Sequence, residues 1–226
     1  MENQPGPMRP RAQLPRPLPV LVLADVSGSM AQDGKIGVLN QSISAMIRSF
    51  AAEDTVRGEI VVGVVTFGGD GARLHHAPVP AREAQWTDMA ASGRTPLGGA
   101  LDLLADLLQD EEIIPRRAFQ PTLVLVSDGM PTDEWHEALT RLLGTERGGK
   151  AVRLAVGIGQ DMDQDAFTVL NQFVANPAIP VMRADEIHRL SSFFAWVTMS
   201  VTTRVRSGRP EDPAVMRPED LLDFMN

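Results

Sequence analysis

The sequence predicts an α/β fold in which helices cover both faces of a mainly parallel sheet. Short apolar runs rich in valine, isoleucine and leucine alternate along the chain with longer segments whose apolar residues recur every three or four positions. The continuous runs are typical of strands buried on both faces, and the spacing of three or four is typical of amphipathic helices. Their regular alternation indicates strand–helix–strand units with parallel strands.

Six segments are expected to be strands. Buried strands are predicted over residues 20–24, 59–67, 122–127, 151–158 and 179–182. The sixth segment, residues 74–79, ends at Pro80. Because proline cannot donate a hydrogen bond to a neighbouring strand, we place this segment at the edge of the sheet, where it can also run antiparallel.

Five segments have the periodicity of helices. They are residues 34–53, 96–108, 133–143, 163–173 and 185–205. Pro96 suits the first turn of the second helix, where an amide donor is not needed. We expect Asp133 to cap the third helix and Trp135 to face the core.

The composition fits a soluble chain of one domain or slightly more and excludes several classes of site. The chain has 226 residues, a formal charge of −8 and no cysteine. Disulfides, zinc–thiolate sites and cysteine nucleophiles are therefore excluded, and the acidic balance argues against a nucleic-acid partner. No apolar run approaches the roughly 18 residues of a membrane span, and residues 1–19 lack the apolar centre of a secretory signal. We expect a cytoplasmic protein with no membrane partner.

The two ends of the chain differ in composition from its middle. Residues 1–19 carry six of the 17 prolines, so we expect residues 1–17 to form a disordered arm. Residues 18–206 are then the folded domain, and residues 207–226 a linker with a short tail. The tail is either frayed or a short amphipathic helix, and the sequence leaves both open.

Three separate segments carry oxygen-bearing side chains to one edge of the predicted sheet. Asp25, Ser27 and Ser29 follow the first strand, Thr95 precedes the second long helix, and Asp128 directly follows a later strand. Right-handed crossovers place the strand-to-helix loops of a parallel sheet at its carboxyl edge, where ligands bind in such folds. We therefore expect these five side chains to converge there.

The five side chains suit a hard divalent cation. Mg²⁺ takes six oxygen ligands in a near-ideal octahedron and retains some of its waters, and Mn²⁺ and Ca²⁺ are the alternatives. Ser27, Ser29 and Thr95 offer neutral hydroxyls, whereas Asp25 and Asp128 offer carboxylates that bind directly or through water. An ion held mainly by neutral ligands keeps most of its charge, so it can accept a carboxylate from a second molecule. These five residues therefore predict a site where a second molecule docks rather than a catalytic centre.

The same residues resemble the von Willebrand factor A family. The stretch Asp25-Val-Ser27-Gly-Ser29 matches the DxSxS metal motif of that family, and Thr95 and Asp128 match its threonine and its last aspartate. All five positions of the family's metal-ion-dependent adhesion site (MIDAS) are present, within a resemblance that covers about residues 18–205. The resemblance implies a doubly wound six-stranded sheet in the order 3-2-1-4-5-6 with one antiparallel edge strand. It also implies a partner protein whose acidic residue completes the metal shell.

Within that family, the chain is most similar to the tellurite-resistance-associated TerY-like proteins. The stretches over residues 18–30 and 127–133 have this character. Members of that group are associated with a protein kinase and a PP2C-type phosphatase in signalling. The resemblance therefore implies a Ser/Thr kinase and a PP2C-type phosphatase as candidate partners in a signalling or stress response.

Two other functions stay open. The first is an adaptor subunit of an ATPase or chaperone complex that uses the same metal site. The second is a Mg²⁺-dependent phosphatase with Asp25 as nucleophile, but such chemistry usually needs an acid two residues later, and Ser27 stands there. Nor is either of the only two lysines, Lys35 and Lys150, an obvious candidate for the site. We expect a binding module and not an enzyme.

Residues near the site have structural alternatives. Arg94 is either a solvated loop residue or a selector of acidic partners. We expect Trp86 to anchor its loop rather than contact a partner. We expect His75 and His76 to lie on a solvated strand instead of binding a metal.

Overall fold

The fold is a single six-stranded sheet with helices on both faces. The computed structural model describes residues 15–53, 58–159 and 162–207. The strands are β1 (Arg16–Asp25), β2 (Gly58–Gly68), β3 (Gly71–Pro80), β4 (Thr122–Ser127), β5 (Val152–Ile158) and β6 (Met182–Ala184). The helices are α1 (Lys35–Ala51), α2 (Leu97–Gln109), α3 (His136–Gly144), α4 (Glu146–Lys150), α5 (Gln164–Val174) and α6 (Ile187–Arg206), with short 3₁₀ segments η1 (Gly28–Gly34) and η2 (Ala81–Glu83).

The sheet has the strand order β3-β2-β1-β4-β5-β6. The pairs of β1 with β2 and β4, of β4 with β5, and of β5 with β6 are parallel. The edge strand β3 pairs antiparallel with β2. The predicted order and the predicted antiparallel edge strand are therefore confirmed.

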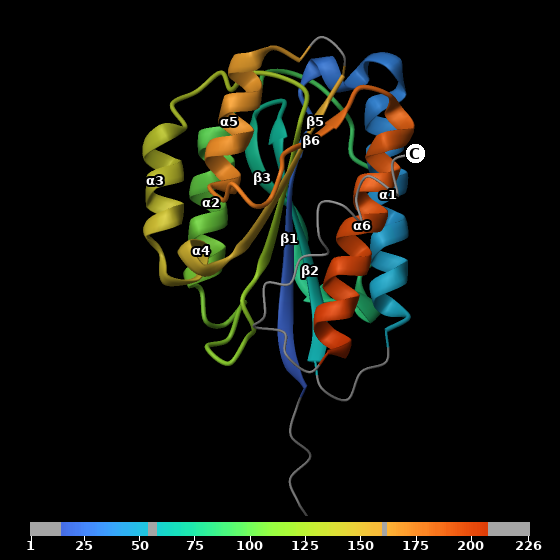
Figure 1. Ribbon diagram of the computed structural model, residues 1–226, viewed down its shortest axis with the longest axis vertical. Helices are drawn as coiled ribbons and strands as arrows, with labels where there is room; N and C mark the ends of the chain where they lie inside the picture. The colour runs from blue at the N-terminus through green and yellow to red at the C-terminus, as the bar shows by residue number, and fades with distance from the viewer. Residues whose placement is uncertain (1–14, 54–57, 160–161, 208–226) are drawn as a thin grey trace, which may run out of the picture.

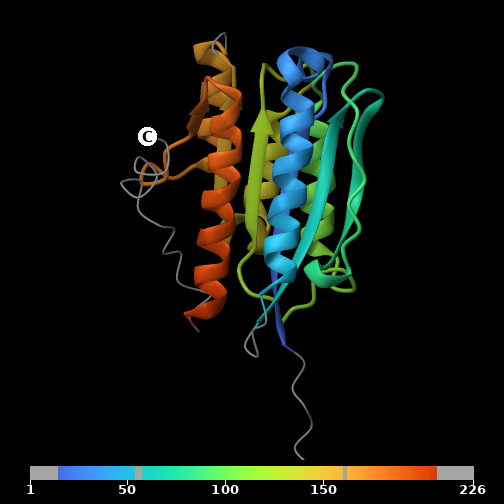
Figure 2. The same ribbon diagram turned by 90° about the vertical axis from the view of Figure 1, so that its right-hand side faces the viewer.

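The helices form two layers, one on each face of the sheet (Figure 1). Alternate residues of β1 belong to two separate cores. Val20 and Val22 pack with side chains of α1 and α6, whereas Leu21 and Leu23 pack with those of α2, α3 and α5. Figure 2 shows α1 and α6 side by side in front of the sheet. Burial on both faces explains why this strand is apolar at every position from Pro17 to Ala24 instead of at alternate ones.

The amino-terminal boundary of the domain differs from the prediction. β1 begins at Arg16, which pairs with Gly58, so Arg16 and Pro17 are part of the sheet and not of a disordered arm. The guanidinium of Arg16 lies 4.0 Å from the centre of the Phe119 ring, a cation–π contact that holds this end of the strand. The expectations for residues 1–14 and for the tail over residues 208–226 lie outside the described residues.

Other predicted boundaries are wrong by a few residues. The last strand covers 182–184 instead of 179–182, because the amide of Ile179 donates to the carbonyl of Asn176 in a turn. α3 begins at His136 and α6 at Ile187, two to three residues later than expected, and α4 was not expected. No helix within the described ranges is both long and apolar enough to cross a membrane.

Candidate metal centre

The candidate metal centre lies where β1 and β4 end at the carboxyl edge of the sheet. β1 ends at Asp25, and β4 ends at Ser127, directly before Asp128. The two strands are neighbours, with Ala24 opposite Val126. Parallel pairing therefore places the two aspartates side by side although 102 positions separate their strand ends in sequence.

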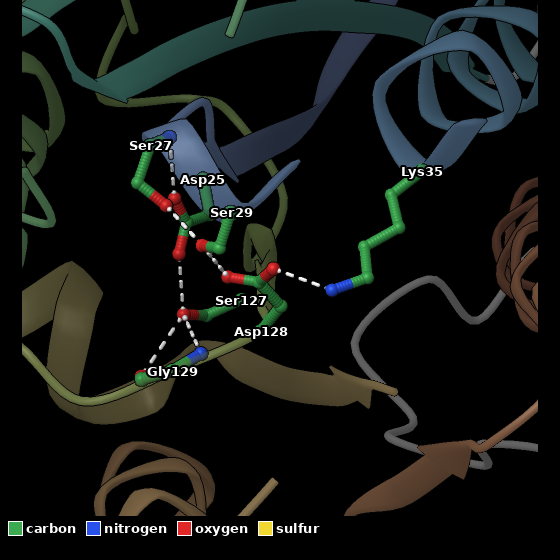
Figure 3. A network of polar contacts seen from close by, with 7 residues as sticks. All are labelled: Asp25, Ser27, Ser29, Lys35, Ser127, Asp128 and Gly129. Carbon is green, nitrogen blue, oxygen red and sulfur yellow. Dashed lines mark hydrogen bonds and ion pairs between the residues drawn. The ribbon is translucent and has the colours of Figure 1, made fainter. Parts of the chain in front are cut away.

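A chain of hydrogen bonds joins Asp25, Ser27, Ser29 and Asp128 (Figure 3). The backbone amide of Ser27 donates to Asp25 Oδ1 at 2.8 Å, and the hydroxyls of Ser27 and Ser29 are 3.0 Å apart. The hydroxyl of Ser29 donates to Asp128 Oδ1 at 2.7 Å. Adjacent ligands of an octahedral ion with bonds of 2.0–2.1 Å are about 3 Å apart. The two serine hydroxyls therefore already have the separation of adjacent metal ligands.

Backbone hydrogen bonds bring the third predicted segment to this edge. The amide of Gly28 donates to the carbonyl of Gly93 at 3.0 Å, and the amide of Ser92 donates to the carbonyl of Val26 at 2.8 Å. Gly93 has a positive φ of 73°, and a Cβ there would lie 2.6 Å from the backbone of Gly69. Only glycine fits this close approach of two loops.

Thr95 is buried and follows Gly93 by two residues, but its hydroxyl is not part of the hydrogen-bond chain within the described residues. Its amide donates to Thr132 Oγ1 at 3.1 Å. Thr95 does not cap α2 with its side chain, because the residue before this helix is Pro96. The amides of Gly98 and Gly99 at the start of α2 donate to the carboxylate of Asp133, both at 3.0 Å.

The prediction that Asp133 caps its own helix is therefore wrong. Its carboxylate serves α2, and α3 begins only at His136. Together with Thr132, whose amide donates to the carbonyl of Thr95 at 2.9 Å, Asp133 joins the segment after β4 to the start of α2. The segment that contains Thr95 and the segment that contains Asp128 are thus fixed to each other.

Asp25 is a buried carboxylate that forms no ion pair within the described part of the chain. Its side chain is fully buried, and the hydroxyl of Ser127 donates to Oδ2 at 2.6 Å. Burial raises the pKa of Asp25, hydrogen bonds from Ser127 and Ser27 oppose the rise, and the charge of Asp128 adds to it. No lysine, arginine or histidine of the described residues forms an ion pair with Asp25. A divalent cation would supply the missing positive charge, so the residues fit such an ion.

Asp128 has a cationic partner that the sequence did not reveal. Lys35, the first residue of α1, donates from Nζ to Asp128 Oδ2 at 2.8 Å, and the side chain of Asp128 is only 1% exposed. The expectation that no lysine serves the site is therefore wrong for Lys35. The position of Lys35 is the sequence feature that indicates such a role. A cation at the start of a helix faces the positive end of the helix dipole, so it needs a nearby anion.

The donors of the site are oxygens. Across the described residues, no group of three or more histidine, cysteine, aspartate or glutamate side chains could hold a metal ion. The site offers two carboxylates and several hydroxyls instead, a set that suits Mg²⁺, Mn²⁺ or Ca²⁺ better than softer ions.

His75, His76 and Trp86 form a separate cluster at β3. The ring centres of His75 and His76 lie 5.4 and 6.4 Å from that of Trp86. The prediction that Trp86 anchors its loop is confirmed, since it packs against the core. The histidine rings contact Trp86 rather than lying free in solvent.

Comparison with known proteins agrees with this geometry. Residues 20–130 match the family model of the von Willebrand factor type A domain. The chain contains a von Willebrand factor type A (VWA) domain. A search of curated proteins gives no match.

Solved structures with this fold include proteins of different kinds. The von Willebrand factor type A protein from Catenulispora acidiphila has 18% identity and a TM-score of 0.63 over 82% of this chain and 42% of its own. Proximal thread matrix protein 1 from the mussel byssus, with a zinc-occupied MIDAS motif, has 15% identity and a TM-score of 0.61 over 81% and 48%. The pilus adhesin SpaC from Lactobacillus rhamnosus GG has 14% identity and a TM-score of 0.68 over 85% and 31%.

At these identities the likeness shows the fold alone. The chain spans less than half the length of each of these three solved chains.

Proposed function

We propose that this VWA domain is a metal-dependent protein-binding module. Asp25, Ser27, Ser29, Thr95 and Asp128 hold a divalent cation, and an acidic side chain of a partner protein completes its coordination. The observation that carries the proposal is the hydrogen-bond chain from Asp25 to Asp128, which begins at a buried carboxylate with no ion pair among the described residues. When bound, the ion supplies a positive charge that an external carboxylate can ligate.

Mg²⁺ is the proposed ion, with Mn²⁺ and Ca²⁺ as alternatives. Hard oxygen donors at the spacing of Ser27 and Ser29 support a small hard cation. The mussel byssus protein of the same fold has zinc in its MIDAS motif, which supports a divalent ion at this edge of the sheet. A docking role is supported by the VWA domain itself and by the adhesin among the proteins with this fold.

The proposed setting is cytoplasmic signalling or stress response of the TerY-like kind. A Ser/Thr kinase and a PP2C-type phosphatase are the proposed partners, and the resemblance of residues 18–30 and 127–133 is the support for them. The acidic charge of −8 supports a protein partner over nucleic acid or an anionic membrane surface.

A pull-down tests the binding function. The tagged protein is incubated with purified kinase and phosphatase candidates in Mg²⁺ or in chelator. We expect capture only in Mg²⁺, lost in Asp25→Ala and Ser27→Ala but retained in Asp165→Ala, which removes an exposed carboxylate from α5. Circular dichroism checks that each variant is folded. Capture that is equal in chelator and Mg²⁺ would contradict the proposal.

A Mg²⁺-dependent phosphatase is the second candidate, because Lys35 lies at the site after all. The arrangement of Ser27 argues against it, since a serine whose amide bonds Asp25 stands where the leaving-group acid would be needed. Hydrolysis of p-nitrophenyl phosphate decides between them. We expect no Mg²⁺-dependent turnover, and turnover that is lost in Asp25→Asn would favour the enzyme.

A further inference from the structure

The ion pair between Lys35 and Asp128 places a fixed positive charge in the candidate metal centre. The Nζ···Oδ2 distance is 2.8 Å, and the two side chains are 16% and 1% exposed. Asp128 accepts from Ser29 with its other oxygen, Oδ1. Figure 3 shows the lysine reaching from the start of α1 to the opposite side of Asp128 from Ser29. The same carboxylate thus belongs both to the hydroxyl cluster and to Lys35.

The position of Lys35 is unfavourable for helix stability alone. It is the first residue of α1, and the first turn of α1 contains no acidic residue. A cation there is repelled by the positive end of the helix dipole. The ammonium of Lys35 also lies close to the backbone of Gly159, the residue after β5. A Cβ added to this glycine would be 3.7 Å from Nζ. Among the described residues, the ion pair with Asp128 compensates for this placement.

We propose that Lys35 sets the balance between metal binding and carboxylate binding at this site. The inference rests on the proposed function and adds a regulating residue to it. Asp25, Asp128 and Lys35 together carry a formal charge of −1 before an ion binds. With a divalent ion the cluster carries +1, whereas without Lys35 it would be neutral.

Two opposite effects follow from this charge count. Lys35 repels an incoming divalent cation and already neutralises one of its two carboxylates, so it weakens metal binding. It also leaves the loaded site net positive, so it strengthens attraction for a partner's carboxylate. Lys35 therefore makes retention of the ion depend on the partner. By linkage, each of the two ligands then favours binding of the other.

Four proteins isolate the charge of Lys35. Lys35→Gln removes the charge but keeps an amide that can donate to Asp128, and Lys35→Arg keeps the charge. Lys150→Gln is the matched control, because Lys150 is the other lysine of the chain and pairs with the exposed Glu146 on α4. Mn²⁺ binding to these variants and to the unaltered protein is measured by the electron paramagnetic resonance signal of free Mn²⁺. Lys35→Met serves as a second neutral variant if Lys35→Gln does not fold.

We expect the neutral variant to bind Mn²⁺ at least about tenfold more tightly than the unaltered protein, because even water-like screening leaves an effect of this size for one charge a few ångströms from a divalent ion. Lys35→Arg and Lys150→Gln should stay within about twofold of the unaltered protein. Unchanged affinity in Lys35→Gln, or equal tightening in Lys35→Arg, would overturn the inference while leaving the metal site intact. Absence of Mn²⁺ binding in every variant would instead overturn the proposed function and the inference with it.

Acetate tests the second effect. Sodium acetate is added as a minimal carboxylate, and the Mn²⁺ affinity is measured again. Acetate should increase the Mn²⁺ affinity of the unaltered protein and of Lys150→Gln by a larger factor than that of Lys35→Gln. An equal or larger increase in Lys35→Gln would overturn the claim that Lys35 favours carboxylate binding.

Discussion

Asp133 gives the sharpest test of how the loops around the candidate site are held. Its carboxylate accepts hydrogen bonds from the amides of Gly98 and Gly99, both at 3.0 Å, although it lies in a different loop. These are among the first amides of α2, which have no partner within their own helix. Asp133 therefore replaces an N-cap side chain that α2 lacks, since no side chain caps this helix from Pro96. We expect Asp133→Ala to destabilise the domain.

The magnitude can be worked from these two bonds. Loss of an N-cap acceptor costs about 1 kcal/mol, and a hydrogen bond to a charged acceptor is worth about 1.5–3 kcal/mol. Gly98 is buried but Gly99 is exposed, so water replaces part of the second bond. We therefore expect a loss of about 2 kcal/mol in the free energy of unfolding. For a domain of this size, that corresponds to a fall of about 4–8 °C in Tm.

Urea denaturation followed by circular dichroism measures this loss. Asp133→Asn retains one acceptor oxygen and should lose about half as much stability. Asp165→Ala is the control, because Asp165 is an exposed acid in the first turn of α5. If Asp133→Ala unfolds at the same urea concentration as Asp165→Ala, the reasoning about α2 is refuted.

Two further predictions concern buried charges. The guanidinium of Arg153 donates to the carbonyls of Phe173 and Gly148 at 2.8 and 2.7 Å. Arg153→Met should therefore lower the free energy of unfolding, measured by urea titration, by about 3 kcal/mol. A loss below about 1 kcal/mol would contradict this. Burial raises the pKa of Asp25 in the folded protein above its ordinary value of 3.8. The stability that this carboxyl contributes is therefore fully present below pH 3.8, and it is lost as the pH rises through the pKa of the folded state. In chelator, the stability of Asp25→Asn relative to the unaltered protein should therefore rise as the pH increases above 3.8, and a constant difference would contradict the assignment.

The sheet and the separate pieces of the site could be predicted because they leave local patterns. β1 is apolar at every position from Pro17 to Ala24 because successive residues such as Val20 and Leu21 enter opposite cores. Pro80 indicated an edge strand, and this strand is β3. The spacing of Ser27 and Ser29 around Gly28 is likewise local, and parallel pairing places Asp128 beside them.

The partners of individual carboxylates could not be predicted in the same way. Asp133 bonds amides 34 and 35 positions away, and Lys35 lies 93 positions from Asp128. Such contacts depend on how loops pack after the sheet has formed, and an aspartate before a helix is equally compatible with capping that helix. The role of Ser127 is not predictable for a similar reason, because the last residue of a buried strand gives no sign that its hydroxyl reaches Asp25.

The most direct test of the candidate metal centre is diffraction from crystals soaked in Mn²⁺. The data are recorded at a wavelength where manganese scatters anomalously. The proposed site predicts one strong anomalous peak between the ends of β1 and β4, within about 2.0–2.3 Å of the hydroxyl oxygens of Ser27 and Ser29. The peak should be absent from Asp25→Ala crystals. No peak at these hydroxyls under saturating Mn²⁺, or a peak that persists in Asp25→Ala, would contradict the metal-dependent docking function.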